Sequence, residues 1–290
     1  MIPLTITDVR AVSGDGAFLI DDGQTAVLYD TGFAFTGYAV ADNVCRILGE
    51  RPLDYILLTH SHYDHALGSI YLRRRYPNVK VIAGNYAQTI FGKPSARAVM
   101  RDLDRKAAAA YGVTEYEDLI DELRADLTVS DGDRITCGRM VFTAVELPGH
   151  TKCSVGYYLA ENRLLLSTET LGVYLGTDLF LPSYLVGYQM TLDSIRKAGE
   201  LDVEQILLPH YGVVSGENAR RYLSRGTETA EKNAMQIRTL LDSGNSVEEV
   251  LEFMTETIYT DQVKPVYPYD AFRLNTEIMI RLVKKECCLG

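Results

Sequence analysis

The stretch Thr59-His60-Ser61-His62-Tyr63-Asp64-His65 places three imidazoles and a carboxylate within a few residues of one another. Imidazole nitrogen and carboxylate oxygen are ligands that suit Zn²⁺, Fe or Mn. His60 and His62 are two residues apart, so on an extended segment both would point to the same side and reach one metal. Asp64 and His65 fall at a turn into the next helix, where they could serve a second metal close by. The stretch therefore predicts a metal site.

The other two histidines follow strand-like segments, as His60 does after the apolar run Ile56-Leu57-Leu58. His150 lies in Leu147-Pro148-Gly149-His150-Thr151, and His210 lies in Leu207-Leu208-Pro209-His210-Tyr211-Gly212. Catalytic loops gather at such places on α/β scaffolds. A lone histidine would be interpreted as a packed or surface residue, but the cluster at 60–65 changes that interpretation. We expect all five histidines of the chain to be metal ligands.

The strand and helix patterns divide the chain into β-rich and α-rich stretches. Residues 4–82 and 131–208 are rich in strand patterns, and two sheets packed together with helices outside would bury both blocks. Short apolar or alternating runs predict strands, and segments with helical spacing predict helices. The strands are expected at 17–20, 25–29, 56–58, 79–82, 134–136, 140–145, 155–159, 163–166 and 205–208, and helices at 37–49, 66–75 and 191–199.

Two further segments lack strand patterns. Residues 85–127 predict a helical insertion of two or three helices, which would serve either as a lid over the site or as a dimer arm. From Glu217 to the end the pattern is mostly helical, with breaks at Gly244 and around Pro265 and Pro268. We therefore expect a catalytic domain over 1–215 and a helical C-terminal extension over 216–290 that packs on the same domain.

Composition limits the classes of partner. The chain of 290 residues is 47% hydrophobic, enough for a packed core, and its net charge is −10. This acidic balance argues against nucleic acid as the main substrate, because phosphate-binding proteins usually present a basic surface. No targeting pattern or apolar stretch of the ~18 residues that span a membrane is visible, so we expect a cytoplasmic protein without membrane contact. The five cysteines form no CxxC pair and suggest no cysteine zinc site.

The order and spacing of these motifs resemble the metallo-β-lactamase superfamily over about residues 10–215. The resemblance rests on His60-x-His62-x-Asp64-His65, the later Pro-Gly-His-Thr and strand-His motifs, and three supporting marks. It implies an α/β fold, an αββα sandwich with a dinuclear metal site at one edge. It also implies that one metal is held by His60, His62 and His150, and the other by Asp64, His65 and His210. The supporting marks are Tyr29-Asp30-Thr31-Gly32, Asp131-Gly132-Asp133 and Pro209-His210-Tyr211-Gly212.

One position departs from the family's pattern. The family usually has an Asp that bridges both metals after the strand that follows Pro-Gly-His-Thr. This chain has Leu166-Ser167-Thr168-Glu169-Thr170 there, so Glu169 is the only carboxylate in that slot. Its side chain is one methylene longer, so it must fold back or shift the second metal. We predict that Glu169 is a ligand, with a weakly bound or different second metal as an open alternative.

The predicted activity follows from the metals. We expect a hydrolase that uses metal-bound hydroxide to cleave an ester-like bond of a small molecule, namely a thioester, a lactone or another carboxylic ester. Asp64 would orient the hydroxide and accept a proton. We expect two Zn²⁺ ions, with Fe or Mn as alternatives. Phosphoester or sulfate-ester hydrolysis, or a metal-stabilised binding protein with vestigial catalysis, remain the alternative functions.

Two features leave more than one interpretation open. The segment 174–184 is apolar and would suit either a pocket wall for an uncharged or acyl substrate or the surface of a homodimer. Five tyrosines in or near site loops could donate a hydrogen bond to a developing oxyanion, although most tyrosines serve packing. These are Tyr63, Tyr174, Tyr184, Tyr188 and Tyr211.

Overall fold

Strand β2 (Phe18–Asp21) shows how the sequence builds layers. Phe18 and Ile20 pack in the core that lies between two sheets, whereas Leu19 between them packs in the core beneath the N-terminal helices. Because successive side chains of a strand point to opposite faces, a fully apolar strand must be covered on both sides. The computed structural model describes residues 1–176, 179–264 and 267–287.

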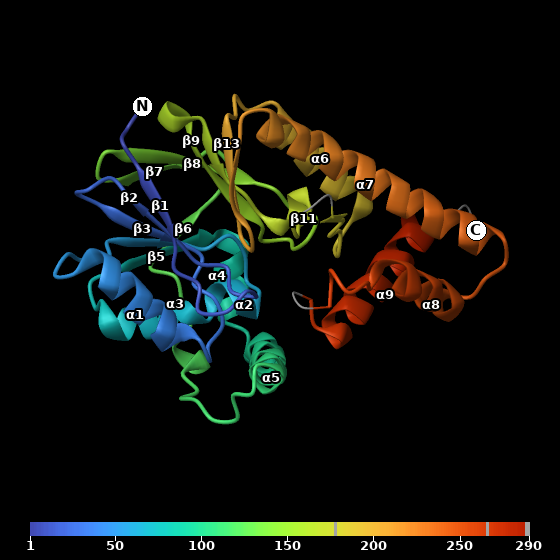
Figure 1. Cartoon of the computed structure of the whole chain (residues 1–290), viewed down its shortest axis with the longest axis horizontal. Helices are drawn as coiled ribbons and strands as arrows, with labels where there is room; N and C mark the ends of the chain where they lie inside the picture. The colour runs from blue at the N-terminus through green and yellow to red at the C-terminus, as the bar shows by residue number, and fades with distance from the viewer. Residues whose placement is uncertain (177–178, 265–266, 288–290) are drawn as a thin grey trace.

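The first sheet contains the strands from the N-terminal block. Its order follows the chain, β1-β2-β3-β4-β5-β6; the first three strands are antiparallel, and β3 to β6 run parallel. Helices α1 (Gly37–Leu48) and α3 (Gly68–Arg75) cover its outer face, and the short α2 (Tyr63–Ala66) precedes α3 (Figure 1). The other strands are β1 (Thr5–Asp8), β3 (Ala26–Tyr29), β4 (Tyr55–Leu57), β5 (Lys80–Gly84) and β6 (Leu127–Val129).

The second sheet has the order β14-β13-β10-β9-β8-β7, and only the β10–β13 pair among these strands is parallel. Helices α6 (Tyr188–Gly199) and α7 (Glu217–Asp242) cover its outer face. The described part of the chain thus forms the predicted αββα sandwich (Figure 1). The strands are β7 (Arg134–Cys137), β8 (Met140–Glu146), β9 (Val155–Leu159), β10 (Leu164–Leu166), β13 (Gln205–Leu208) and β14 (Gly212–Ser215).

Two buried tyrosines tie the sheets and the site loops together. The hydroxyl of Tyr29 donates to the carbonyl of Ser167 at 2.7 Å, and that of Tyr157 donates to the carbonyl of Leu58 at 2.7 Å. Both rings are fully buried in the core between the sheets. The first bond therefore fixes the chain just before Glu169, and the second fixes it just before His60.

The predicted helical insertion is only partly helical. Helices α4 (Asn85–Phe91) and α5 (Pro94–Ala110) confirm its first half. The second half was wrongly predicted to be helical: it holds one 3-10 turn, η1 (Ile120–Glu122), in otherwise irregular chain, and ends in β6. Arg101 on α5 donates hydrogen bonds to the carboxylates of Asp118 and Asp121. These bonds hold the second half against α5 as an irregular segment.

The C-terminal extension consists of α7, α8 (Val247–Ile258) and α9 (Tyr269–Glu286). Their apolar faces form one cluster, into which Tyr184 of the preceding loop also packs. The predicted breaks at Gly244 and Pro268 are confirmed, since they separate these helices, whereas Pro265 lies outside the described residues. A small hairpin of β11 (Val173–Tyr174) and β12 (Phe180–Leu181) leads into the loop; residues 177–178 of the predicted pocket wall lie outside the described residues.

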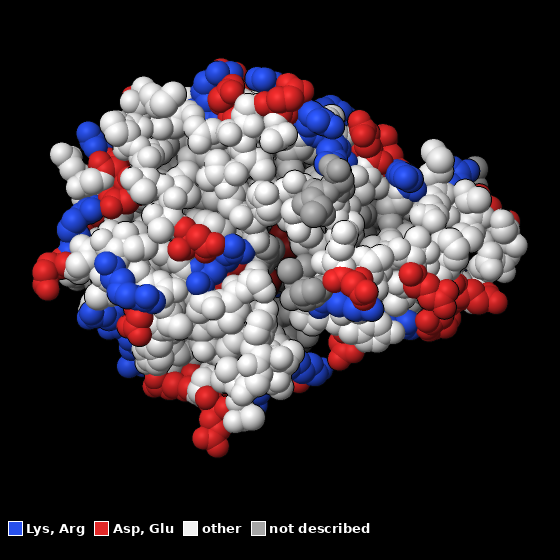
Figure 2. Space-filling view, in the orientation of Figure 1, with Lys and Arg blue, Asp and Glu red and all other residues white. Residues whose placement is uncertain are grey.

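The charges on the surface concern the expectation about nucleic acid, and the helices concern the expectation about membranes. Figure 2 shows acidic and basic side chains interspersed over one face, among wide uncharged areas. Over the residues that the structure describes, no helix combines the length and the apolar character needed to cross a membrane.

Candidate metal centre

Strand ends bring the predicted ligands together. Strands β3 and β4 are parallel in one sheet and β10 and β13 are parallel in the other, so within each sheet the carboxyl ends of the pair lie at one edge. His60 follows β4, Glu169 begins the 3-10 turn η3 (Glu169–Leu171) after β10, and His210 follows β13. His150 lies in the loop between β8 and β9.

Four side chains form a first group, in which one ligand atom of each lies within 4.8 Å of the others. They are His60, His62, His150 and Glu169. His62 Nδ1 is 2.9 Å from His150 Nε2, and Glu169 Oε2 is 2.8 Å from the same nitrogen. Glu169 Oε2 is also 3.6 Å from His60 Nε2. The three histidines that the resemblance assigns to one metal therefore lie together.

A second group contains Asp64, His65 and His210. Asp64 Oδ2 lies 3.5 Å from His65 Nε2 and 3.7 Å from His210 Nε2. The carboxylate of Glu169 reaches this group as well: Oε2 is 3.7 Å from His65 Nε2, and Oε1 is 3.3 Å from His210 Nε2. Glu169 thus spans both groups in spite of its extra methylene, and all seven predicted residues occupy one place.

Hydrogen bonds behind the rings orient four of the histidines. His150 Nδ1 is 2.7 Å from Ser183 Oγ, and His210 Nδ1 is 3.3 Å from the carbonyl of Asp15. His60 and His65 are held in the same way, by Thr59 Oγ1 and by Asp30 Oδ2, each at 2.9 Å from Nδ1. When Nδ1 donates, Nε2 keeps its lone pair and faces the site, which is the form that ligates a metal.

Asp30 holds both Thr59 and His65 in place behind the predicted ligands. It is completely buried, and its oxygens accept from the amide of Thr59 at 2.7 Å and from the Thr59 hydroxyl at 2.8 Å, besides facing His65. Its backbone has φ +53°, a left-handed conformation that is uncommon outside glycine. Such strain persists where the surroundings determine it, and it often marks functional sites.

Gly149 has a steric role beside His150. Its φ is +149°, and a Cβ there would lie 2.2 Å from Thr191 Oγ1. Any side chain would therefore push the loop away from α6. The glycine of the Pro-Gly-His-Thr motif lets this loop pass close to the helix and place the imidazole.

The arrangement fits a bound cation. His60 Nε2 and His65 Nε2 are buried and have no hydrogen-bond partner among the described residues. Because buried polar atoms are nearly always paired, two unpaired nitrogens that face carboxylates fit the coordination of a cation. The set of imidazole nitrogens and carboxylate oxygens suits Zn²⁺, Fe or Mn.

Electrostatics favour the same conclusion. Burial lowers the pKa of His62 to about 3, with His150 adding to the effect, and burial also lowers the pKa of His60 well below its ordinary value. Neutral imidazoles bind metals. Burial would raise the pKa of Glu169, but His150 and the other neighbouring histidines hold it well below its usual range. Burial likewise opposes charge on His65, yet Asp64 and Asp30 raise its pKa, so the second group attracts a positive charge.

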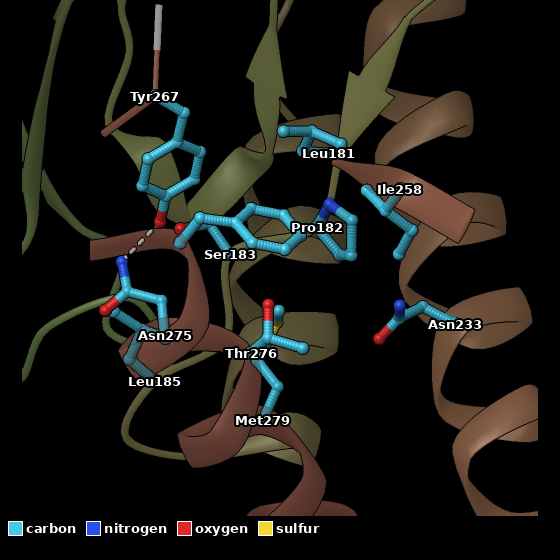
Figure 3. Close-up of a pocket in the computed structure, with 11 residues that line it drawn as sticks. Leu181, Pro182, Ser183, Leu185, Asn233, Ile258, Tyr267, Asn275, Thr276 and Met279 are labelled. Carbon is cyan, nitrogen blue, oxygen red and sulfur yellow. Dashed lines mark hydrogen bonds between the residues drawn. The ribbon is translucent and has the colours of Figure 1, made fainter. Parts of the chain in front are cut away.

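Sequence reasoning missed two residues beside the site. Ser183 contacts His150 from the loop after β12, and Tyr267 lies between α8 and α9. Burial raises the pKa of Tyr267, and the carboxylates of Glu169 and Asp64 raise it further, so its phenol is neutral; the residue lines the same cavity as Ser183 (Figure 3). A serine or tyrosine far along the chain carries no local motif. Of the five tyrosines singled out, Tyr184 is buried and bonds Asn233 instead of facing the centre.

Comparison with known proteins identifies the family. The sequence model of the metallo-beta-lactamase superfamily matches residues 17–210, so the chain belongs to this superfamily. It is 28% identical over 180 residues to a protein named glyoxylase B2 from Dictyostelium discoideum, covering 59% of this chain and 54% of that protein. It is 29% identical over 153 residues to a hydroxyacylglutathione hydrolase from Stenotrophomonas maltophilia, covering 53% and 44%. The chain spans about half the length of these relatives.

Solved structures agree on the fold. A beta-lactamase domain protein from Burkholderia ambifaria has a TM-score of 0.68 at 17% identity, covering 97% of this chain and 85% of that one. A metallo-beta-lactamase family protein from Thermus thermophilus has a TM-score of 0.65 at 18% identity, covering 94% and 89%. At these identities the likeness concerns the fold, and it extends over the C-terminal helices.

Proposed function

We propose that this chain is a metal-dependent hydrolase that cleaves an ester-type bond of a small molecule, such as a thioester, a lactone or another carboxylic ester. The observation that carries the proposal is the position of Glu169, whose carboxylate lies within 3.7 Å of His60 and His65 and closer to His150 and His210. Relatives named hydroxyacylglutathione hydrolase support an acyl bond. The matched relatives therefore favour carboxylic over phosphoric or sulfuric esters.

The seven side chains would hold two cations, one in each group, and we propose Zn²⁺, with Fe or Mn as alternatives. Such cations, when bound, lower the pKa of a water molecule and polarise the oxygen of the scissile group. Asp64 would orient that water and accept its proton, since its Oδ2 lies between the imidazoles of His65 and His210. Asp30 and Thr59 would keep His60 and His65 in the ligating orientation.

A panel of chromogenic substrates tests the reaction class. The purified protein is assayed with a thioester, a lactone, a carboxylic ester, a phosphodiester and a sulfate ester. We expect turnover of acyl substrates that a chelator abolishes and added Zn²⁺ restores. His60→Ala serves as the negative control. Turnover confined to the phosphodiester or the sulfate ester would replace the proposed class, and the absence of turnover with every acyl substrate would refute it.

A further inference from the structure

The loop between β1 and β2, residues 9–17, lies against the second group of candidate ligands. We call it the β1–β2 loop. The amide of Gly16 in this loop donates to the carbonyl of Asp64 at 3.2 Å. A Cβ on Gly16 would lie only 3.0 Å from Nδ1 of His65, so the backbone passes directly against that ring. The loop therefore contacts two of the three members of the second group through one glycine.

Arg10 of the same loop holds the third member, His210. Its Nη1 donates to the carbonyl of His210 at 2.5 Å. Its Nε and Nη2 donate to the carboxylate of Asp8 at 2.9 and 2.6 Å. Because a guanidinium is planar, this two-bonded pair fixes the direction in which Nη1 points. The carbonyl of Asp15 lies 3.3 Å from His210 Nδ1, so the loop holds both the backbone and the ring of this histidine.

The side chain of Asp15 keeps the β1–β2 loop in its conformation. The residue is completely buried, and its carboxylate accepts from the amides of Ala11 and Val12 at 2.9 and 3.1 Å. It also accepts from the amide of Phe33 at 3.1 Å and from the hydroxyl of Thr36 at 2.6 Å. A buried carboxylate is unfavourable unless it is hydrogen-bonded, so these four donors favour one arrangement of the loop. The contacts to the second group thus come from a fixed support.

The first group of candidate ligands has other supports. His60 Nδ1 faces the hydroxyl of Thr59 at 2.9 Å, and His150 Nδ1 faces that of Ser183 at 2.7 Å. In the part of the chain that the structure describes, no hydrogen bond or ion pair joins the β1–β2 loop to His60, His62 or His150. A disturbance of the loop would therefore displace ligands of the second group and leave those of the first in place.

We propose that the β1–β2 loop, through Arg10 and Gly16, determines the affinity of the second cation and not that of the first. This rests on the proposed function, because it takes one cation to be held in each group. Arg10 is a positioning residue: it acts on His210 through the carbonyl and is no ligand itself. The carboxylate of Asp8 at 2.6 Å offsets the charge of the guanidinium, so the arginine supplies geometry at little electrostatic cost to a cation.

Zn²⁺ affinities of matched arginine variants test the proposal. Arg10→Met removes the donor to His210, and Arg51→Met is the control, because Arg51 forms a similar two-bonded pair with Asp21 at the other end of the β1–β2 pair. Metal-free protein, prepared by dialysis against a chelator, is titrated calorimetrically with Zn²⁺ beside a competing chelator of known affinity. We expect two cations in the parent and in Arg51→Met, and a second cation bound about 10- to 100-fold more weakly in Arg10→Met. Loss of a positive charge alone would strengthen cation binding, so weaker binding reports lost positioning.

Two further variants show which cation responds and whether the whole loop is involved. His210→Ala removes a ligand of the second group, and adding Arg10→Met to it should change the affinity of the remaining first cation by less than about twofold. Gly16→Ala tests the contact with His65, where the added Cβ would displace the ring; it should weaken the second cation about tenfold. Gly199→Ala is its control, because a Cβ there meets nothing within 4 Å, and it should bind both cations like the parent.

Ester turnover is measured on the same samples, so the loop and the reaction are judged separately. A parent that binds two Zn²⁺ without turnover would refute the reaction, and the affinities of the variants would still decide the role of the loop. Arg10→Lys cannot bind Asp8 by two bonds and also reach His210, so it should weaken the second cation to a lesser degree, and with Gly16→Ala it decides the matter if Arg10→Met does not fold. Parental affinity for the second cation in these variants, equal weakening of both cations, equal weakening in Arg51→Met, or a parent that binds fewer than two cations would each overturn the proposal.

Discussion

At the scale of single residues, the geometry of the centre depends on Glu169. Thr168 begins its 3-10 turn, and the Thr168 side chain accepts from the amide of Thr170 at 3.1 Å. The Thr170 hydroxyl in turn accepts from the amide of His150 at 3.2 Å. The turn is therefore attached to the loop of the first group, and the longer side chain reaches from there to the second.

Replacing the carboxylate tests its role as a bridge. Glu169→Gln keeps the size of the side chain but removes its charge, and a neutral amide is a poor ligand for two cations. We expect this variant to lose one metal per chain while His60, His62 and His150 retain the other. Metal content by elemental analysis and turnover are measured on the same samples. A variant with two metals and parental activity would show that Glu169 is no ligand.

Glu169→Asp is the sharper test of length. It restores the residue that is usual in the family, but in a site shaped around the longer side chain. We expect the first metal to stay and the occupancy or spacing of the second to change. Turnover should fall, because displacing a reacting group by about 1 Å costs roughly 100-fold. Parental rates with two metals would contradict a site that depends on this length.

The sequence locates the clustered His, Asp and Glu side chains better than the residues that support them. The stretch at 60–65 is a local signal, and His150 and His210 each follow an apolar run, so all three places could be found by inspection. Ser183 could not, because the packing of the loop after β12, and no local pattern, brings its hydroxyl to His150. Residues whose role depends on tertiary packing carry no periodicity to detect.

At the scale of elements, length and exposure decide what can be predicted. The longer strands with buried, alternating side chains and the helices that follow them were predicted at nearly the right places. The strands absent from the predicted set are short and lie at edges or in the small hairpin: β1, β6, β11, β12 and β14. Leu127 of β6 is 52% exposed, so the strand shows no burial pattern. Two to four residues are too few to establish a period of two.

Helix α5 contains a buried acid whose titration should affect stability. Asp104 is 1% exposed and accepts from the amide of Ala34 at 2.8 Å and from the hydroxyl of Tyr116. Burial raises the pKa of Asp104 to about 6, from an ordinary value near 4. The folded state therefore binds the proton more tightly than the unfolded state. The associated stability is fully present below pH ~4 and is lost as the pH rises through about 6.

Asp104→Asn should remove this pH dependence. The amide oxygen can still accept from Ala34, and the amide nitrogen can donate to Tyr116. Relative to the parent, we expect the variant to gain about 3 kcal/mol in free energy of unfolding between pH ~4 and pH ~7.5, measured by urea denaturation. Asp102→Asn, an exposed change on the same helix, is the control. Between the same two pH values, its free energy of unfolding relative to the parent should change by less than about 0.5 kcal/mol. A difference between variant and parent that does not change with pH would contradict the assignment.

Removing the capping box of α8 tests whether the C-terminal extension unfolds together with residues 1–215. The Ser246 side chain accepts from the amide of Glu249, and the Glu249 side chain accepts from the amide of Ser246. Ser246→Ala should cost about 1 kcal/mol. If residues 216–290 pack on the same domain, as we propose, this cost shifts one unfolding transition seen by every probe. Ser224→Ala, exposed within α7, should not destabilise the protein. A separate early transition that alone responds to Ser246→Ala would make the extension an independent unit.

At the scale of the whole molecule, the metal centre joins parts that are distant in sequence. The seven clustered side chains follow strands of both sheets, and the loop behind His150 is packed against the C-terminal helices. A bound cation would therefore cross-link the two sheets and, through Ser183, the extension. Ions that bind only the folded state stabilise it by an amount that grows with the logarithm of their free concentration divided by the Kd.

Metal removal should therefore lower the stability of the entire chain. Protein purified without added metal is analysed for its metal content, then dialysed against a chelator and melted with and without Zn²⁺. We expect two metals per chain before dialysis, and a stabilisation of about 4 kcal/mol when free metal reaches roughly 1,000 times the Kd. His60→Ala should respond less, because it lacks one ligand of the first group, whereas Asp102→Asn should respond like the parent. A folded protein that holds no metal as purified, and whose melting is indifferent to chelator and Zn²⁺, would show that these seven side chains do not form a metal site.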